Sequence, residues 1–525
     1  MIRRTRLLAT ALVCSVALLV GACGGDGDST SSTSTGTTGA TGEPVAGGHA
    51  RILTMAEPRS LDPATLGNAY ATTAVVGNAL YGTLMIDDDS GGLEFKMAES
   101  FTTNDGGQTF ELKLRPGLVF SDGTPLNAEA VKFNWDRTKD PAVGSTYASE
   151  ASMIASTEVV DDVTLKVTMA QPMPKFGQVI ATSTLNWIAS PAALQAGQEA
   201  FNANPIGAGP FTLESWNRQA DMVLVKNPKY WDAPKPYLDR ITLRTATDAG
   251  QRYNTVLTGG ADVAVETNWQ NIAKAEEAGL PNTVMDLSGG LFMALNSRRA
   301  PFDDVRARQA VAAALDLEAL NLAVYNGTGR TAEHLFAESS PFRSDTPLTT
   351  TDKDKAQRLF DELAAEGKPV SFTFTTFPTT ENKAMAENVQ AQLSAFNNVN
   401  VEVKVVDLAE VGKLRATHDF DVLISSAFFR DPEPRLWTAF SSEASANMSG
   451  VKDPALDQAL LDGRNATTVE ERKTAYETAQ QRLREQVPVV FLVRVAAGVV
   501  TAKNVGGVMQ YGHGSLMPEE LWIQK

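Results

Sequence analysis

The sequence contains little cysteine and little histidine, and both shortages restrict its chemistry. Cys14 and Cys23 are the two cysteines among 525 residues. Both lie before residue 24, so the body of the chain has no thiol for a disulfide, a nucleophile or a metal site. The histidines are widely separated and lack the spacing of metal ligands: His49, His334, His418 and His513. We therefore expect neither a metal site nor a cofactor.

Several motifs of enzymes are also missing. The hydrolase pattern G-x-S-x-G, the phosphate-binding P-loop and the zinc pattern H-E-x-x-H do not occur. "GTGRTA" at 327–332 matches a dinucleotide pattern, but it follows a predicted helix instead of a strand, which favours a plain loop. "DDDSGG" at 87–92 begins like a calcium loop, but Ala98 stands where a glutamate is needed, which favours a hairpin tip. A catalytic triad could still be assembled by folding, so enzyme function is disfavoured without being excluded.

The chain has a single long apolar run, from Leu7 to Val20, behind a basic start. A basic start, an apolar run and small residues in this order are typical of a secretion signal, and the run is short for a membrane span. Its ending, "LVGAC", resembles the bacterial lipobox, in which the cysteine becomes the lipid-modified first residue after cleavage. We expect a signal peptide over residues 1–22 and lipidation of Cys23, with an uncleaved signal anchor as the alternative.

Residues 24–48 are almost entirely glycine, serine, threonine, alanine and acidic residues. Such a segment buries too little apolar surface to order itself, so residues 23–48 are predicted to be a lipidated cysteine and a flexible tether. The formal net charge of the chain is −16, which disfavours nucleic-acid binding because that binding needs concentrated positive charge. We expect a protein held by lipid at the extracytoplasmic face of a bacterial cell membrane.

The body mixes strand and helix patterns. Residues 108–116 and 163–171 alternate apolar and polar side chains, as half-buried strands do. Residues 303–325 have apolar residues at helical spacing after an acidic start, and 352–367 and 468–486 are further predicted helices with acidic first turns. Strands and helices interspersed in this way indicate an α/β fold.

Four separated segments of the body carry short motifs in a fixed order. They are S-L-D-P in residues 57–85; R-P-G, F-x-D-G-x-P and A-x-x-V in 97–137; G-x-G-P-F and N-P-x-Y-W in 204–244; and P-F-x-D-x-R-x-R-x-A in 295–316. A weaker match continues through 447–492. Together these segments resemble the extracellular solute-binding proteins of ABC importers, in the class that takes peptides and nickel. The shared motifs identify scaffolding and say little about the solute.

The resemblance implies a two-lobed type II periplasmic-binding-protein fold in its enlarged form. Lobe I would consist of residues 49–74, 201–289 and 490–525, with an inserted subdomain at 75–200. Lobe II would be residues 290–489. The solute would lie between the lobes.

The resemblance also points to residues of the second lobe. In peptide-binding relatives, an aspartate shortly after the F-D-x-x strand pairs with the α-ammonium group of the peptide. The matching position after "FDVLI" is Arg430, which reverses the charge and would suit a carboxylate, phosphate or sulfate. Two alternatives remain: Asp431 takes the role of the aspartate, or the solute is not a peptide with a free amino terminus. Arg430 could also pair with Asp431 or Glu433 at the rim without contacting solute.

Other residues are expected at the same site. Phe428 and Phe429 could each offer a flat apolar surface, but strand neighbours point to opposite faces, so one of them belongs to the core. In lobe I the family pattern suggests that Glu57, Asn268 and Trp269 reach the solute. Trp269 could equally be a core tryptophan.

The resemblance implies a monomeric solute-binding component that captures an oligopeptide or similar small solute and delivers it to an ABC permease. Binding of a non-peptide anionic solute in the same fold is an alternative. A lipid-anchored hydrolase and a sensing protein with the same closing lobes are the other hypotheses.

Overall fold

The computed structural model describes residues 34–35, 39–88 and 91–525. The predicted signal peptide and Cys23 lie outside the described residues. Within the predicted tether, Ser34–Thr35 form β1, which pairs with β13 (Asn282–Met285). The Gly47 amide also donates a hydrogen bond to the Tyr237 carbonyl oxygen at 2.7 Å. These described parts of the tether are bonded to the body through their backbone, which requires no apolar side chain.

The largest sheet has eight strands in the order β1-β13-β19-β12-β2-β11-β10-β9. Their bounds, besides those of β1 and β13, are β2 (His49–Thr54), β9 (Phe211–Trp216), β10 (Asp221–Lys226), β11 (Arg240–Thr245), β12 (Val263–Glu266) and β19 (Ala497–Thr501). The associated helices are α1 (Pro63–Leu66), α2 (Ala74–Tyr81), α6 (Pro191–Gln195), α7 (Gln198–Ala203), α8 (Ala249–Leu257) and α9 (Trp269–Glu277). One strand from near the C-terminus, β19, therefore lies inside a sheet built mainly from earlier residues.

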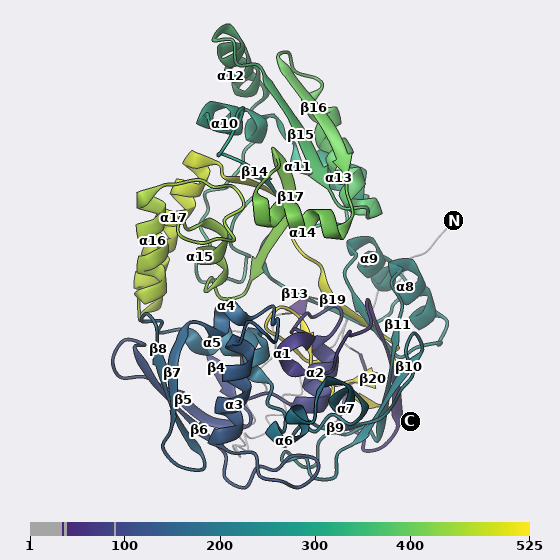
Figure 1. Ribbon diagram of the computed structural model, residues 1–525. Helices are drawn as coiled ribbons and strands as arrows, with labels where there is room; N and C mark the ends of the chain where they lie inside the picture. The colour runs from purple at the N-terminus through teal and green to yellow at the C-terminus, as the bar shows by residue number, and fades with distance from the viewer. Residues whose placement is uncertain (1–33, 36–38, 89–90) are drawn as a thin grey trace, which may run out of the picture. The chain divides into compact units, whose positions relative to one another are not determined.

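A second sheet has five strands in the order β16-β15-β17-β14-β18. These are β14 (Ser288–Leu295), β15 (Val370–Thr376), β16 (Val399–Val405), β17 (Val422–Phe429) and β18 (Val489–Val493). Its helices are α10 (Val305–Ala314), α11 (Leu317–Tyr325), α12 (Lys353–Ala365), α13 (Thr380–Leu393), α14 (Leu408–Thr417), α15 (Arg435–Phe440), α16 (Pro454–Asn465) and α17 (Val469–Gln486). Figure 1 shows α16 and α17 side by side, in contact with each other.

A four-stranded antiparallel sheet in the order β5-β6-β8-β7 has its own apolar core. It comprises β5 (Ala98–Thr102), β6 (Thr109–Leu114), β7 (Ile154–Val159) and β8 (Thr164–Met169), with α3 (Ala128–Lys139), α4 (Ala148–Ala151), α5 (Phe176–Thr182) and the 3-10 turn η1 (Thr184–Asn186). Short pairs complete the fold: β3 (Met85–Asp87) with β4 (Leu93–Phe95), β20 (Val505–Gly506) with β23 (Trp522–Ile523), and β21 (Gln510–Tyr511) with β22 (Ser515–Leu516).

Two short crossovers join the eight-stranded and five-stranded sheets. The chain leaves β13 and enters β14 through residues 286–287, and it returns from β18 to β19 through residues 494–496. The five-stranded sheet is thus formed by one continuous stretch of chain, whereas the eight-stranded sheet needs segments from both sides of that stretch. Two adjacent connections of this kind are where a hinge between two bodies can bend.

Local sequence explains where the helices begin and end. The Thr468 side chain accepts from the Glu471 amide and the Glu471 carboxylate accepts from the Thr468 amide, which forms a capping box at the start of α17. The predicted helix over 303–325 is two helices, because Asp316 caps α11 by accepting from the Ala319 amide and interrupts the run at that point. Among the described residues, no helix combines the length and apolar character needed to cross a membrane.

Candidate functional site

A cavity of about 770 Å³ lies beside the second crossover. The five-stranded sheet contributes to its wall, as do helices and loops that accompany both sheets, together with Arg494, Val495 and Ala496 of the crossover. Apolar and aromatic side chains share the wall with a similar number of polar and charged ones, and the volume falls within the roughly 300–1,000 Å³ typical of small-molecule sites. The residues used below are Met55, Tyr70, Asp248, Arg252, Asn268, Trp269, Leu291, Tyr325, Glu381, Phe428 and Arg494.

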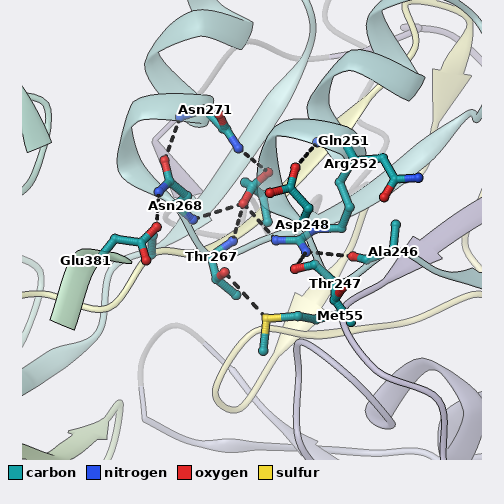
Figure 2. A network of polar contacts seen from close by, with 12 residues as sticks. Met55, Ala246, Thr247, Asp248, Gln251, Arg252, Thr267, Asn268, Asn271 and Glu381 are labelled. Atoms are coloured by element: carbon teal, nitrogen blue, oxygen red, sulfur yellow. Dashed lines mark hydrogen bonds and ion pairs between the residues drawn. The ribbon is translucent and has the colours of Figure 1, made fainter. Parts of the chain in front are cut away.

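A fully buried ion pair supports the wall on the side of the eight-stranded sheet. The Arg252 Nη2 atom lies 3.2 Å from Glu266 Oε1, and neither side chain is exposed. The same carboxylate accepts hydrogen bonds from the backbone amides of Thr267 and Asn268 at 2.7 and 3.0 Å, and from the side-chain nitrogen of Asn271 at 3.3 Å. Figure 2 shows Arg252, Thr267, Asn268 and Asn271, which contribute to this network. Glu266 therefore fixes the backbone that presents Asn268 to the cavity.

Asn268 connects the two sides of the cavity. Its side-chain oxygen caps α9 by accepting from the Asn271 amide, and its side-chain nitrogen donates to Glu381 Oε1 at 2.9 Å. Glu381 belongs to the first turn of α13, which accompanies the five-stranded sheet (Figure 2). One hydrogen bond thus joins elements that belong to different sheets.

Trp269 lines the cavity but is only 5% exposed. Its indole N–H donates to the Arg494 carbonyl oxygen at 2.9 Å, and the Arg330 guanidinium lies 5.0 Å from the ring centroid. With its polar atom bonded to the crossover and its ring buried, Trp269 serves chiefly as a core residue that supports the crossover. Of the two interpretations that the sequence left open, this one fits the structure better.

Arg494 is a buried cation that binds backbone. Its side chain donates to the carbonyl oxygens of Gly289, His334, Leu335 and Phe336 at 2.7 to 3.0 Å. Desolvation lowers its pKa to about 10, so the guanidinium remains charged at neutral pH. Arg494 therefore ties the second crossover to the start of the five-stranded sheet.

The two phenylalanines at the end of β17 point in opposite directions. Phe428 lines the cavity, whereas Phe429 is fully buried and packs edge-on against Phe336. This is the alternation expected of strand neighbours. The Phe428 ring also makes edge contacts with Tyr70 and His513.

Arg430 lies outside the larger cavity. Its Nη1 atom is 3.4 Å from Asp87 Oδ2, and both residues line a separate cavity of about 260 Å³. Burial raises the pKa of Asp87, while the charge of Arg430 opposes that rise. The guanidinium predicted to meet an anionic solute therefore already faces a carboxylate.

Asp431 and Glu433 are engaged by other arginines. Both Asp431 oxygens accept hydrogen bonds from Arg472 at 2.7 Å, and Glu433 Oε2 accepts from Arg464 Nε at 2.9 Å. These side chains are all nearly buried. Both carboxylates thus have an arginine partner other than Arg430, and a bidentate partner on Asp431 favours a structural role for it over capture of an ammonium group.

Glu57 is directed toward neighbouring protein. Its carboxylate accepts from Trp216 Nε1 at 2.9 Å and from the Gln219 amide at 3.2 Å, and it lies 3.5 Å from Arg218. Glu57 is not among the described residues that line either cavity. The structure thus gathers Asn268, Trp269 and Phe428 at the larger cavity and places Arg430 and Asp431 at the smaller one.

Sequence reasoning missed Tyr70, Asp248, Glu381 and Arg494. Asp248, Glu381 and Arg494 come from segments without a recognisable motif, and Tyr70 lies in the segment 57–85 but outside its S-L-D-P motif. Glu381 is 113 residues from its partner Asn268. The acidic first turn of α13 could have suggested a helix start, but nothing in it indicates a cavity wall. In the described part of the chain, no group of three or more His, Cys, Asp or Glu side chains could hold a metal ion.

Comparison with known proteins agrees with this architecture. Residues 93–447 match the family described as "Bacterial extracellular solute-binding proteins, family 5 Middle". The glutathione-binding protein GsiB of Pectobacterium atrosepticum is 29% identical over 475 residues, which cover 85% of this chain and 89% of that protein.

Two solved structures share the fold at 22% identity and a TM-score of 0.77. They are AgaA of A. tumefaciens R10 in complex with agropinic acid, with 91% of this chain and 99% of that chain covered, and DppA of Helicobacter pylori in complex with the peptide STSA, with 92% and 99% covered. The predicted α/β fold of type II periplasmic binding proteins is thereby confirmed.

The family match spans well over half of the chain and includes the four-stranded sheet, the larger cavity's α9 and most of the five-stranded sheet. Such proteins act outside the cytoplasm, where they bind a small solute and deliver it to a permease. The chain belongs to the bacterial extracellular solute-binding proteins of family 5, the binding components of ABC importers, and is not an enzyme.

Proposed function

We propose that the protein captures a short peptide or a similar small solute with an ammonium group in the larger cavity. The observation that carries the proposal is that helices and loops accompanying both sheets form the wall of one cavity together with the second crossover. A solute there contacts both bodies only when they are close together, so its binding free energy favours the closed arrangement. The glutathione and peptide named for the relatives are solutes of compatible chemistry.

The charges around the larger cavity favour a cationic group over an anionic one. Arg252 is paired with Glu266, and Arg494 is bonded to four carbonyl oxygens. Asp248 accepts a hydrogen bond from the Gln251 backbone amide with one carboxylate oxygen, and Glu381 accepts one from the Asn268 side chain. Their remaining lone pairs are suited to an ammonium group.

The alternative of a purely anionic solute at Arg430 has less support. The carboxylate of Asp87 is 3.4 Å from the guanidinium. An anion there would compete with that carboxylate and would meet its repulsion.

Calorimetric titration with alanine peptides, glutathione and simple dicarboxylates would test the proposal. We expect binding of ammonium-bearing peptide-like solutes and a loss of about tenfold or more in affinity for Glu381→Gln, because a charged hydrogen bond becomes a neutral one. Glu387→Gln, which changes an exposed glutamate of the same helix, is the matched control. Tight binding of dicarboxylates, with no effect of Glu381→Gln, would contradict the assignment.

The remaining predictions are part of the proposal. The signal peptide over 1–22, lipidation at Cys23 and a monomeric state fit a protein that works at the outer face of a membrane. We place lobe I at residues 49–74, 201–289 and 490–525, its insert at 75–200 and lobe II at 290–489. The crossovers at 286–287 and 494–496 support the two boundaries between lobe I and lobe II. Incorporation of labelled fatty acid that is lost in Cys23→Ser would support the anchor, and unchanged labelling would contradict it.

A further inference from the structure

An apolar partition separates the two cavities. Met285, Leu287 and Ala497 form a small buried cluster, and Tyr70 and Phe428 pack against it. Tyr70 and Phe428 face the larger cavity, whereas Met285 faces the smaller one. One cluster of five side chains therefore has a cavity on each side.

Aromatic contacts close this partition. The Phe428 ring meets Tyr70 at a centroid distance of 6.4 Å and an interplanar angle of 88°, and it meets His513 at 5.5 Å and 76°. The Tyr70 hydroxyl donates to the Ala496 carbonyl oxygen at 3.3 Å, which ties that ring to the second crossover. Phe428 comes from β17, while Tyr70 and His513 come from segments that accompany the eight-stranded sheet.

The partition carries no charge at neutral pH. Desolvation by the surrounding protein, and then the guanidinium groups of Arg435 and Arg430, lower the pKa of His513 to about 3. His513 therefore remains a neutral ring beside Phe428. A polar solute in the larger cavity meets an uncharged wall at this point.

The two sides of the partition differ in chemistry. The larger cavity has aromatic walls and the two carboxylates Asp248 and Glu381. The smaller cavity is lined mainly by polar and charged groups, including Lys175, Asp286 and Ser339. Its volume would add about a third to that of the larger cavity if the two were joined.

We propose that Phe428 and Tyr70 set the maximum length of the solute. This inference rests on the proposed function, and it adds which side chains decide the size class. Solutes that fit the larger cavity bind while the partition is closed, whereas a longer peptide would collide with the Phe428 ring. Removal of either ring joins the cavities, so the far end of a longer peptide gains the polar groups of the smaller one.

The experiment uses the full-length protein and alanine peptides of two to six residues, measured by isothermal titration calorimetry. For wild type we expect affinity to fall by about tenfold or more between one peptide length and the next, because a rigid wall excludes the added residue. Phe428→Ala should move this fall to a greater length and improve binding of the first excluded peptide by about tenfold. Tyr70→Ala opens the partition from the opposite side and should act in the same direction.

Two further variants separate the partition from general damage to the cavity. Leu291→Ala removes apolar surface from the larger cavity at a residue outside the five-residue partition and should leave the limiting length unchanged. Phe428→Leu keeps an apolar side chain and should shift the limit less than alanine does. If the wild type binds peptides and neither Phe428→Ala nor Tyr70→Ala changes the limiting length, the inference is wrong while the proposed function stands. If the wild type binds none of the peptides, both fail.

Discussion

The change from Glu266 to glutamine tests the buried pair behind the larger cavity. Glutamine can keep the oxygen that meets Arg252 and the Thr267 and Asn268 amides, but it removes the negative charge and places an NH2 group opposite the Asn271 side-chain nitrogen. The Arg252 guanidinium is fully buried, and its other hydrogen bonds go to the carbonyl oxygens of Ala246 and Thr247. Carbonyl groups satisfy its N–H donors without neutralising its charge, so the substitution leaves an uncompensated cation in the interior.

The expected cost follows from that burial. Removing one partner of a buried ion pair typically destabilises a protein by about 3–5 kcal/mol, whereas an exposed pair contributes about 0–1 kcal/mol. We therefore expect Glu266→Gln to lower the free energy of unfolding by about 3 kcal/mol or more. Adding Arg252→Met should recover at least half of this loss, because the unpaired charge is then gone.

Urea unfolding followed by circular dichroism measures these differences as shifts in midpoint at an unchanged slope. The matched control is Glu214→Gln, because Glu214 forms a two-point contact with Arg240 in which the side chains are 44% and 39% exposed. That change should cost no more than about 1 kcal/mol. The reasoning is refuted if Glu266→Gln costs as little as the control, or if the double variant is less stable than Glu266→Gln alone.

Three further changes have definite expected outcomes. Burial raises the pKa of Glu519 from 4.5 to about 7, so between these pH values the folded protein keeps a proton that the unfolded chain has released, and wild-type stability falls as pH rises. In urea unfolding, the stability of Glu519→Gln relative to wild type should therefore increase by about 2–3 kcal/mol from pH 5 to pH 8. A difference that stays constant with pH would contradict this. Arg494→Met removes the donors of four hydrogen bonds, so thermal unfolding should report a loss of about 3 kcal/mol or more, and a loss below about 1 kcal/mol would show that the crossover is held by other contacts. Asp431→Asn leaves Arg472 buried without its carboxylate and should lower the free energy of unfolding in urea by about 3 kcal/mol. Its solute affinity, measured by calorimetry, should stay within about threefold of wild type. A much larger loss of affinity would place Asp431 in the binding site.

Much of the fold could be predicted because its signals are local. The alternation in residues 108–116 corresponds to β6, and the acidic start of residues 468–486 corresponds to the capping box of α17. The opposite orientation of Phe428 and Phe429 also follows from the two-residue repeat of a strand. These features depend on neighbouring residues, which a single sequence displays directly.

The rest of the site depends on contacts between distant segments. Asn268 could be proposed from its place in the family pattern, but its bond to Glu381 arises only when α9 and α13 meet. Arg430 is next to Asp431 in the sequence, yet Asp431 binds Arg472 and Arg430 lies beside Asp87. Charge reversal at a matched position therefore did not reveal which charges the folded protein leaves for a solute.

The position of β19 has a consequence for synthesis and export. Residues 497–501 lie between β12 and β13 in the eight-stranded sheet, so that sheet remains incomplete until almost the whole chain is available. Pairings across such large sequence separations form slowly, because loop closure must precede them. A nascent chain that lacks its final segment thus cannot complete the eight-stranded sheet, and an incomplete sheet favours passage through a narrow translocation channel before the polypeptide reaches its native state outside.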